Sequence, residues 1–223
     1  MKNRYNLSVS ENIFVAKRNI VDYIYKSAKL EGLNITFPET YAIYEKARVK
    51  DVDMDTILVV NNLKHGWKVI LDAVNAPIIT DLNLICSIHK EVARDEALEW
   101  GKLRTGRVGI SGTNYLPPIP ESENVEEQLK SLLEISNPTD RAITIMFWGM
   151  KSQLFWDGNK RTSMLLANKI MIENGCGIIS VPSELIQDFS TVLSAYYDDD
   201  ENLKNAKSFV YDKCIDGIHL DVR

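Results

Sequence analysis

The feature that most constrains this chain is the stretch at residues 153–161, which reads Gln-Leu-Phe-Trp-Asp-Gly-Asn-Lys-Arg and leads into an apolar segment. Gly158 and Asn159 are typical of a helix start, where several backbone N–H groups have no partner within the helix. Lys160 and Arg161 add two cationic side chains at the same place. Unpaired N–H groups and positive charge together favour a bound anion, so the stretch predicts an anion site.

The acid in this stretch and the segments on either side complete the prediction. Asp157 precedes the glycine and offers a hard oxygen ligand for a divalent cation beside the predicted phosphate position. Residues 139–152 and the residues that follow Asn159 are apolar on nearly every side. This pattern indicates two buried helices that hold the loop rigidly between them. Mg²⁺ together with a nucleotide fits such a site; the alternative is a helix-capping turn whose charges are solvated.

The composition limits the class of protein. With 223 residues, 45% hydrophobic and 26% charged, the chain is large enough for one substantial core. A net charge of -5 argues against a general nucleic-acid or membrane-surface binder, since both need a cationic face. The sequence shows neither an apolar signal core nor a membrane span, so we expect a cytoplasmic protein. The cysteines form no C-x-x-C pair and are expected to be free thiols: Cys86, Cys176 and Cys214.

Apolar residues recur at helical spacing along most of the remaining chain. Helices are predicted at residues 8–30, 38–48, 53–74, 80–93, 121–135, 139–152, 159–173, 182–197 and 201–214. His65 and His89 lie on these helices, and a lone helical histidine is more often a packed or surface residue than a ligand. Tyr196 and Tyr197 are expected to pack in the interior or at an interface rather than against a ligand.

Residues 101–120 interrupt the helical pattern with four glycines and, near the end, three prolines. Arg104, Val108 and Ile110 alternate with small or polar residues, which predicts a short β-hairpin. An exposed strand edge grips an extended segment through its main chain, so this hairpin is a candidate site for a partner peptide. The alternative is a surface hairpin that only closes off a helical domain.

Residues 153–161 resemble the signature of the Fic/Doc family, H-x-F-x-(D/E)-G-N-(G/K)-R, which forms a helix-loop-helix that binds ATP. The matching residues are Phe155, Asp157, Gly158, Asn159 and Arg161, with Lys160 as the variant seen in the Doc branch. Gln153 stands where the family has its catalytic histidine, and Met164 where the more common branch has a further arginine. The resemblance therefore points to a fold and a ligand more directly than to an active catalyst.

Two further stretches resemble motifs of the same family. Ser27, Glu31 and Gly32 fit the (S/T)-x-x-x-(E/N)-(G/N) motif of self-inhibited members, in which the glutamate takes the space of the γ-phosphate. Considered alone, Glu31 would be an exposed carboxylate beside a C-capping glycine. The flap motif G-x-x-R-x-x-x-V-x-I, which holds the target protein in the family, is matched by Gly101, Arg104, Val108 and Ile110.

The resemblance implies an all-α fold, the Fic helical bundle with a short β-hairpin flap. Residues 1–223 are expected to form a single domain. Within it, residues 1–50 would be an N-terminal helical extension with the inhibitory motif, and residues 51–223 would be the Fic core. Because residue 164 is not an arginine, Glu31 is predicted to pair with Lys160 or Arg161 instead.

The family transfers AMP from ATP, or in the Doc branch the γ-phosphoryl group, to a hydroxyl of a target protein. The resemblance assigns Asp157 to Mg²⁺ and residues 158–161 to the nucleotide. A glutamine amide cannot accept the hydroxyl proton at position 153, and loss of a general base typically costs about 10² to 10⁴ in rate. We therefore predict a nucleotide-binding protein, nominally an AMP or phosphoryl transferase, with weakened or lost activity. A donor or acceptor that needs no base at 153 is another reading.

The expected partners are ATP or another nucleotide and a target protein bound along the flap. The acidic composition excludes nucleic acid and membranes as general partners. Association into homo-oligomers stays open, because no surface stripe decides it. The alternative function is a catalytically inactive helical interaction or regulatory module that binds an extended peptide through the flap.

Overall fold

The computed structural model describes residues 1–218, which contain ten α-helices, two short 3₁₀ turns and one two-stranded sheet. The prediction of an all-α fold is confirmed. The helices are α1 (Val9–Arg18), α2 (Ile20–Leu30), α3 (Phe37–Tyr44), α4 (Met54–Asn75), α5 (Leu82–Val92), α6 (Ser122–Leu133), α7 (Pro138–Ser152), α8 (Asn159–Glu173), α9 (Ile186–Asp198) and α10 (Leu203–Lys213). The 3₁₀ turns are η1 (Ser183–Leu185) and η2 (Asp200–Asn202).

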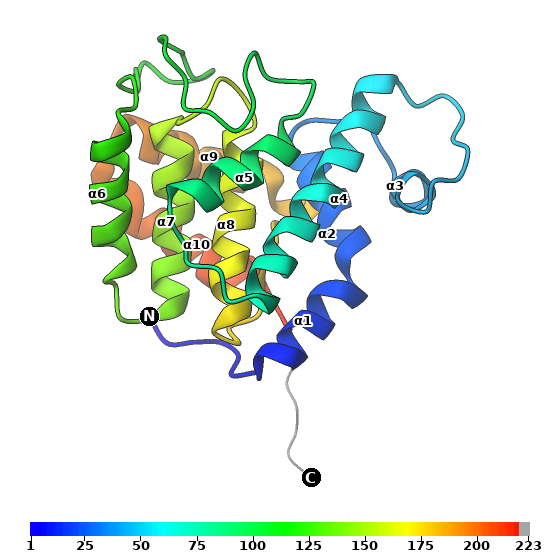
Figure 1. Ribbon diagram of the computed structural model, residues 1–223, viewed down its shortest axis with the longest axis horizontal. Coiled ribbons are helices and arrows are strands. Elements are labelled where there is room, and N and C mark those ends of the chain that lie inside the picture. The colour runs from blue at the N-terminus through cyan, green and yellow to red at the C-terminus, as the bar shows by residue number, and fades with distance from the viewer. Residues whose placement is uncertain (219–223) are drawn as a thin grey trace.

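Helices α7 and α8 lie side by side in the middle of the molecule (Figure 1). Helix α8 is buried along nearly its whole length, as its lack of a polar face predicts. Helices α4 and α5 pack against α8, and α6 and α10 pack against α7. The loop that joins α7 to α8 is therefore anchored at both ends by the core, as predicted.

Side-chain caps fix where several helices begin. Asp53 and Asp81 accept hydrogen bonds from the first turns of α4 and α5, at 2.7 and 2.8 Å. Ser8 forms a capping box with Glu11 at the start of α1. The predicted single helix over residues 8–30 is wrong, because the chain breaks at Asn19 into α1 and α2. Asparagine competes with helical hydrogen bonding through its side chain, and here the Asn19 amide lies 3.4 Å from the Tyr23 hydroxyl.

The predicted hairpin at residues 101–120 is also corrected. This segment, described throughout, contains no strand, and the single sheet among residues 1–218 pairs β1 (Ile178–Ile179) with β2 (Ile215–Asp216). The physical reason is that the chain folds around a side chain instead of pairing with itself. The buried guanidinium of Arg104 donates hydrogen bonds to the carbonyls of Gly106, Pro117 and Pro118. The prolines moreover have no N–H to donate to a ladder.

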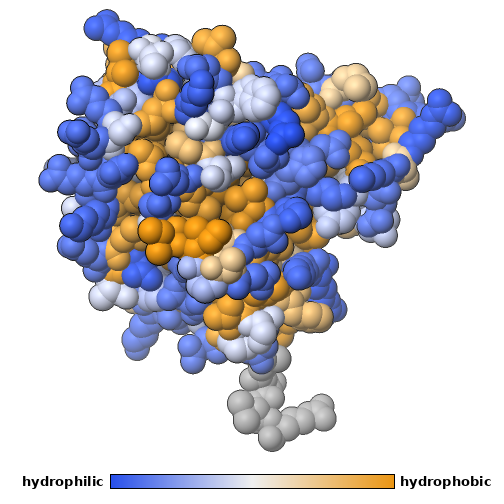
Figure 2. Space-filling model, viewed as in Figure 1, coloured by the Kyte–Doolittle hydropathy of each residue, from blue (hydrophilic) through white to orange (hydrophobic). Residues whose placement is uncertain are grey.

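The cysteines follow the prediction, since Cys176 and Cys214 are buried, Cys86 is half-buried, and all three are free thiols. Figure 2 shows polar side chains over much of the visible face, with apolar surface gathered in several areas between them. Within residues 1–218, none of the helices combines the length and the apolar character that a membrane crossing requires.

Candidate functional site

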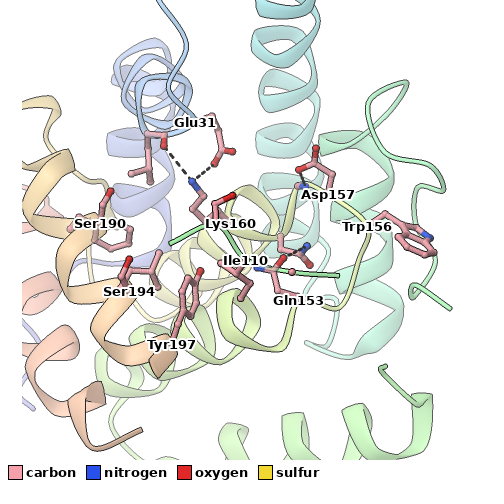
Figure 3. Close-up of a pocket in the computed structure, with 16 residues that line it drawn as sticks. Glu31, Ile110, Gln153, Trp156, Asp157, Lys160, Ser190, Ser194 and Tyr197 are labelled. Atoms are coloured by element: carbon pink, nitrogen blue, oxygen red, sulfur yellow. Dashed lines mark hydrogen bonds and ion pairs between the residues drawn. The ribbon is translucent and has the colours of Figure 1, made fainter. Parts of the chain in front are cut away.

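A cavity of about 410 Å³ lies at the start of α8. Its walls come from the end of α2, segment 109–111, the loop between α7 and α8, and one face of α9 (Figure 3). Helix α8 begins at this cavity without a side-chain cap, because its N-cap is Gly158. The positive end of the helix dipole is thus available to an anion in the cavity.

The loop between α7 and α8 turns through two left-handed residues, Gln153 with φ 46° and Gly158 with φ 70°. Glycine adopts this conformation without a steric penalty. Space gives a second reason at 158, because an added Cβ would lie 3.1 Å from the Cβ of Ala93, just after α5. Gly158 therefore allows the loop to lie directly against α5.

Asn159 closes the loop on itself. Its Oδ1 accepts the N–H of Phe155 at 2.9 Å, and its Nδ2 donates to the Phe155 carbonyl at 2.8 Å and to Gln153 Oε1 at 3.1 Å. The side chain is buried, and all these bonds stay within the loop. Asn159 lines the cavity, but its amide maintains the shape of the loop instead of facing a ligand.

Gln153, which stands where the sequence resemblance implies a catalytic histidine, is held at both ends of its amide. Its Nε2 donates to the Met150 carbonyl at 2.7 Å, and its Oε1 accepts from Asn159. The Gln153 carbonyl accepts a further bond from Arg104 Nε at 2.6 Å. An amide offers no basic atom, so this side chain can neither accept a proton nor reorient without losing its bonds.

Lys160 points into the cavity, and Glu31 faces it from the end of α2 (Figure 3). Lys160 Nζ lies 3.5 Å from Glu31 Oε1 and 3.4 Å from the Leu30 carbonyl oxygen. The predicted pairing of Glu31 with Lys160 is confirmed. Glu31 Oε1 is buried and makes no hydrogen bond. Ser27 lies one turn earlier on α2, and its carbonyl accepts the Glu31 N–H at 3.2 Å.

Arg161, which was predicted to bind the anion, does not line the cavity. Its side chain is 3% exposed and turns toward α5 and the residues after it. One guanidinium nitrogen donates to both carboxylate oxygens of Glu96, at 2.8 and 2.9 Å, and to the Val92 carbonyl at 3.0 Å. Burial by itself would lower the pKa of Arg161, but the bond to Glu96 together with the charges of Glu31, Glu96 and Asp157 outweighs burial and raises that pKa. Adjacent helical residues point about 100° apart, so only Lys160 faces the cavity.

Asp157 is the exposed acid of the loop, with 62% of its side chain open to solvent. Its Oδ1 accepts the N–H of Gly158 and lies 3.9 Å from Arg161. Residues 1–218 hold no group of three His, Cys, Asp or Glu side chains able to bind a metal. Mg²⁺ commonly binds through one or two carboxylates and phosphate oxygens, so a lone carboxylate beside the anion site fits an ion that arrives with a nucleotide.

His89 connects α5 to the loop between α7 and α8. It is fully buried, and its ring stacks on Phe155 with centroids 3.7 Å apart. Its Nε2 lies 2.9 Å from the Asp157 carbonyl oxygen, and its Nδ1 accepts the N–H of Gly101 at 2.9 Å. Burial lowers the pKa of His89 to about 4, so the ring is neutral near pH 7. The sequence predicts a packed or surface histidine, but contains no signal for these two bonds.

The flap residues divide into two groups. Arg104 is 1% exposed, so it cannot contact a target protein directly. Val108 and Ile110 are half-buried, and Ile110 lines the cavity together with Gly109 and Ser111. The absence of a strand in this described segment removes the regular edge on which the peptide-binding alternative depends.

Helix α9 supplies a wall that was not predicted. Ser190, Ser194 and Tyr197 face the cavity, and the two serines are four residues apart on one helix face (Figure 3). Tyr197 is buried, and its burial followed by the charge of Glu31 raises its pKa. Tyr196 instead packs edge-on against Phe147. The spacing of the serines was visible in the sequence, but serines on an amphipathic helix are too common to indicate a site.

Comparison with known proteins finds similarity to one family. Residues 79–171 match the model of the Fic/DOC family. The protein adenylyltransferase fic-1 of Caenorhabditis elegans is 27% identical over 183 residues, which cover 73% of this chain and 34% of that protein. The protein adenylyltransferase Fic of Drosophila willistoni is 26% identical over 179 residues, covering 75% of this chain and 35% of that protein. The chain thus spans about a third of the length of these curated relatives.

Solved structures show the same fold. A Fic domain-containing signalling protein from Bacteroides thetaiotaomicron has a TM-score of 0.71 at 15% identity, covering 96% of this chain and 94% of that chain. Residues 134–508 of Fic-1 from C. elegans give a TM-score of 0.68 at 23% identity, covering 89% of this chain and 61% of that chain. The predicted Fic helical bundle is therefore confirmed.

Proposed function

We propose, on the premise that residues 79–171 carry a Fic/DOC-family domain, that the cavity at the start of α8 binds ATP together with Mg²⁺. The proposed activity is transfer of AMP, or of a phosphoryl group, from ATP to a hydroxyl of a target protein. Gln153 weakens or abolishes this activity. The observation that carries the proposal is the uncapped start of α8 with Lys160 and Asp157 beside it in one cavity.

The cavity suits a nucleotide in size and in the distribution of its groups. Its volume of about 410 Å³ lies in the range of ligand sites, roughly 300 to 1,000 Å³. Among the described residues that line it, Lys160 is the single cation, so the phosphates belong at the start of α8. Leu30, Leu193 and Tyr197 give an apolar wall for the base. A target hydroxyl would approach past Ile110, which lines the cavity.

Glu31 competes with the nucleotide for Lys160. A phosphate oxygen bound to Lys160 would replace the Glu31 carboxylate, whose ion pair is long at 3.5 Å. A partly solvated ion pair of this kind contributes about 0 to 1 kcal/mol, so a nucleotide is able to displace it. We therefore assign Glu31 as an inhibitory residue that lowers nucleotide affinity and is removable by substitution.

The protein's own residues supply charge stabilisation and orientation but no base. The N–H groups at the start of α8 and the Lys160 ammonium would stabilise negative charge on the phosphates. Asp157 would hold Mg²⁺, which neutralises phosphate charge when it is bound. The Gln153 amide cannot remove the proton of an attacking hydroxyl, and the missing base raises the barrier by about 3 to 5 kcal/mol.

Calorimetry with Mg²⁺ and ATP tests the binding. We expect Glu31→Gly to bind more tightly than the native chain, and Lys160→Met in the Glu31→Gly background to lose about 10- to 100-fold in affinity, since a charged hydrogen bond is removed. Lys130→Met, an exposed lysine on α6, is the matched control. Absence of binding by both the native chain and Glu31→Gly would end the proposal.

The catalytic part is tested by transfer of label from ATP to protein. We expect Gln153→His in the Glu31→Gly background to label proteins at least about 100-fold faster than Glu31→Gly alone, because a base is restored. Equal rates in the two proteins would show that position 153 does not limit the reaction. Labelling from α-labelled ATP against γ-labelled ATP distinguishes AMP transfer from phosphoryl transfer.

A further inference from the structure

Two side chains outside the cavity connect the loop at 153–157 to the flap segment at 101–111. His89 contacts the loop at the Asp157 carbonyl and the flap at the Gly101 N–H. Arg104 contacts the loop at the Gln153 carbonyl and the flap at the carbonyls around it. Both side chains are fully buried, and both act on main-chain atoms.

The two bonds of His89 require one protonation state. Nδ1 accepts the Gly101 N–H, so it carries no proton. Nε2 therefore carries the proton and donates it to the Asp157 carbonyl. A doubly protonated ring would set an N–H against the N–H of Gly101 and break that bond. The charged groups that act on the ring are Arg161 of α8 and Asp157 of the loop.

Gly101 is shaped for this contact. Its φ is 74°, and an added Cβ would lie 2.9 Å from the Cβ of Lys90 on α5 and 3.2 Å from the Cys86 carbonyl. Only a residue without a side chain brings its N–H so close to α5. The flap thus starts at a point fixed by helix α5.

Arg104 makes the second connection through main-chain carbonyls. Its guanidinium donates to the carbonyls of Gln153 at 2.6 Å, of Pro118 at 2.5 Å and of Pro117 at 3.3 Å. Its backbone N–H donates to the Leu154 carbonyl at 3.0 Å. A buried arginine that bonds the carbonyls of Gly106, of Pro117 and Pro118, and of Gln153 holds three segments of the chain in one arrangement.

We propose that His89 and Arg104 are positioning residues that lock the flap segment to the anion loop, so that the Asp157 carboxylate keeps a fixed place relative to the flap wall at Ile110. The role of Asp157 in holding Mg²⁺ rests on the proposed function. The lock itself is a claim about hydrogen bonds, which can be tested without nucleotide. Neither residue touches the cavity, so each acts through the main chain.

Amide hydrogen exchange and NMR test the lock directly. His89→Phe retains the ring stacked on Phe155 but removes both hydrogen bonds. We expect exchange at the Gly101 amide to accelerate about 3- to 10-fold, the loss of one net hydrogen bond. His65→Phe, an exposed histidine on α4, is the control. In the native protein, ¹⁵N shifts of His89 should show the Nε2–H tautomer near neutral pH. Unchanged exchange at Gly101, or the Nδ1–H tautomer, would overturn the proposal.

Arg104→Lys tests the second connection while it retains the charge. A lysine ammonium cannot reach carbonyls on both sides as a planar guanidinium does, so exchange at the amide of residue 104, which donates to the Leu154 carbonyl, should accelerate by a similar factor. Arg107→Lys, on an exposed arginine of the same segment, should leave this rate unchanged. Equal effects of the two substitutions would overturn the proposed function of Arg104.

Nucleotide binding separates positioning from a general loss of structure. In the Glu31→Gly background, His89→Phe should reduce ATP affinity in the presence of Mg²⁺ by about 3- to 10-fold, and leave Mg²⁺-free ATP affinity within about twofold, because the lock acts on Asp157. His89→Gln restores a donor toward the Asp157 carbonyl. This variant should therefore regain the ATP affinity that His89→Phe loses in the presence of Mg²⁺. Equal losses with and without Mg²⁺ would overturn positioning. If no variant binds ATP, the proposed function fails while the exchange data still decide the lock.

Discussion

The inner face of the loop at residues 153–161 lies against α5, and its outer face lines the cavity; the two faces pair their charges differently. On the inner face, Arg161 is 3% exposed and bonds both oxygens of Glu96, at 2.8 and 2.9 Å. On the outer face, Lys160 is 32% exposed and lies 3.5 Å from a Glu31 oxygen. A short buried pair fixes a conformation, whereas a long, partly solvated pair can be exchanged for another anion.

The difference teaches that one short motif holds two kinds of residue. Arg161, Asn159 and Gly158 give the loop its shape against α5 and within itself. Lys160 and Asp157 line the cavity, where a ligand can reach them. Substitutions on the inner face should therefore change the free energy of unfolding, and substitutions on the outer face should change binding.

The largest effect should come from Arg161→Met. Removal of the guanidinium leaves the largely buried Glu96 carboxylate with the Asn62 amide at 2.8 Å but without a cation, which should lower the free energy of unfolding by about 3 to 5 kcal/mol. Lys160→Met is the matched control and should cost less than about 1 kcal/mol, because its ion pair is partly solvated. Urea unfolding monitored by circular dichroism gives both values. Similar losses in the two variants would remove the distinction between the faces.

A second inner-face effect should appear on acidification. Burial lowers the pKa of His89 from 6.5 to about 4, so the unfolded chain takes up this proton first. The contribution of His89 to stability is complete above about pH 6.5, falls as the pH drops toward 4, and then levels. Between pH 7 and pH 4.5 the loss attributable to His89 should be about 2 kcal/mol.

The measurement is urea unfolding at several pH values in that window for the native chain, His89→Phe and the control His65→Phe. The native chain and His65→Phe should share the steeper pH dependence, and His89→Phe should show a shallower one. A native-like slope in His89→Phe would mean that other groups account for the acid sensitivity.

Gly158→Ala should have an intermediate effect. The left-handed conformation costs a residue with a Cβ roughly 1 to 2 kcal/mol, and the new methyl group would lie 3.1 Å from Ala93. Gly109→Ala, in the flap, is the control, because nothing lies within 4 Å of its added Cβ and its φ is not positive. Thermal unfolding should show a lower Tm for Gly158→Ala alone. A Tm equal to that of Gly109→Ala would show that the loop accommodates a methyl group at residue 158.

The sequence predicts the helices well where local signals decide them. The caps at Asp53 and Asp81 and the apolar character of α7 and α8 are local, and the structure follows them. The break at Asn19 was missed because the apolar spacing runs on through it. The pairing of Glu31 with Lys160 is predicted only when the motif that contains Glu31 and the motif that contains Lys160 are considered together.

Other features depend on contacts between distant residues. Arg161 turns inward because Glu96, 65 positions earlier, lies beneath it. No sequence pattern predicts this ion pair. Arg104 appears as one member of an alternating pattern, yet its buried guanidinium prevents the hairpin that this pattern predicts. His89 joins Gly101 and Asp157 only after α5 is packed against the loop. Such contacts are tertiary, so local propensity cannot supply them.

The smallest effect should come from Glu31→Gln on the outer face. The substitution keeps the shape of the side chain and removes its charge, so it isolates the ion pair with Lys160. Since such a pair contributes about 0.2 to 1 kcal/mol, Mg²⁺-ATP affinity should rise about 1.5- to 5-fold, and the gain should shrink at high salt. Calorimetry should show no change for Glu126→Gln, an exposed glutamate on α6. If Glu31→Gly tightens binding but Glu31→Gln does not, the glutamate excludes nucleotide by its volume, and charge exchange at Lys160 is not the basis of inhibition.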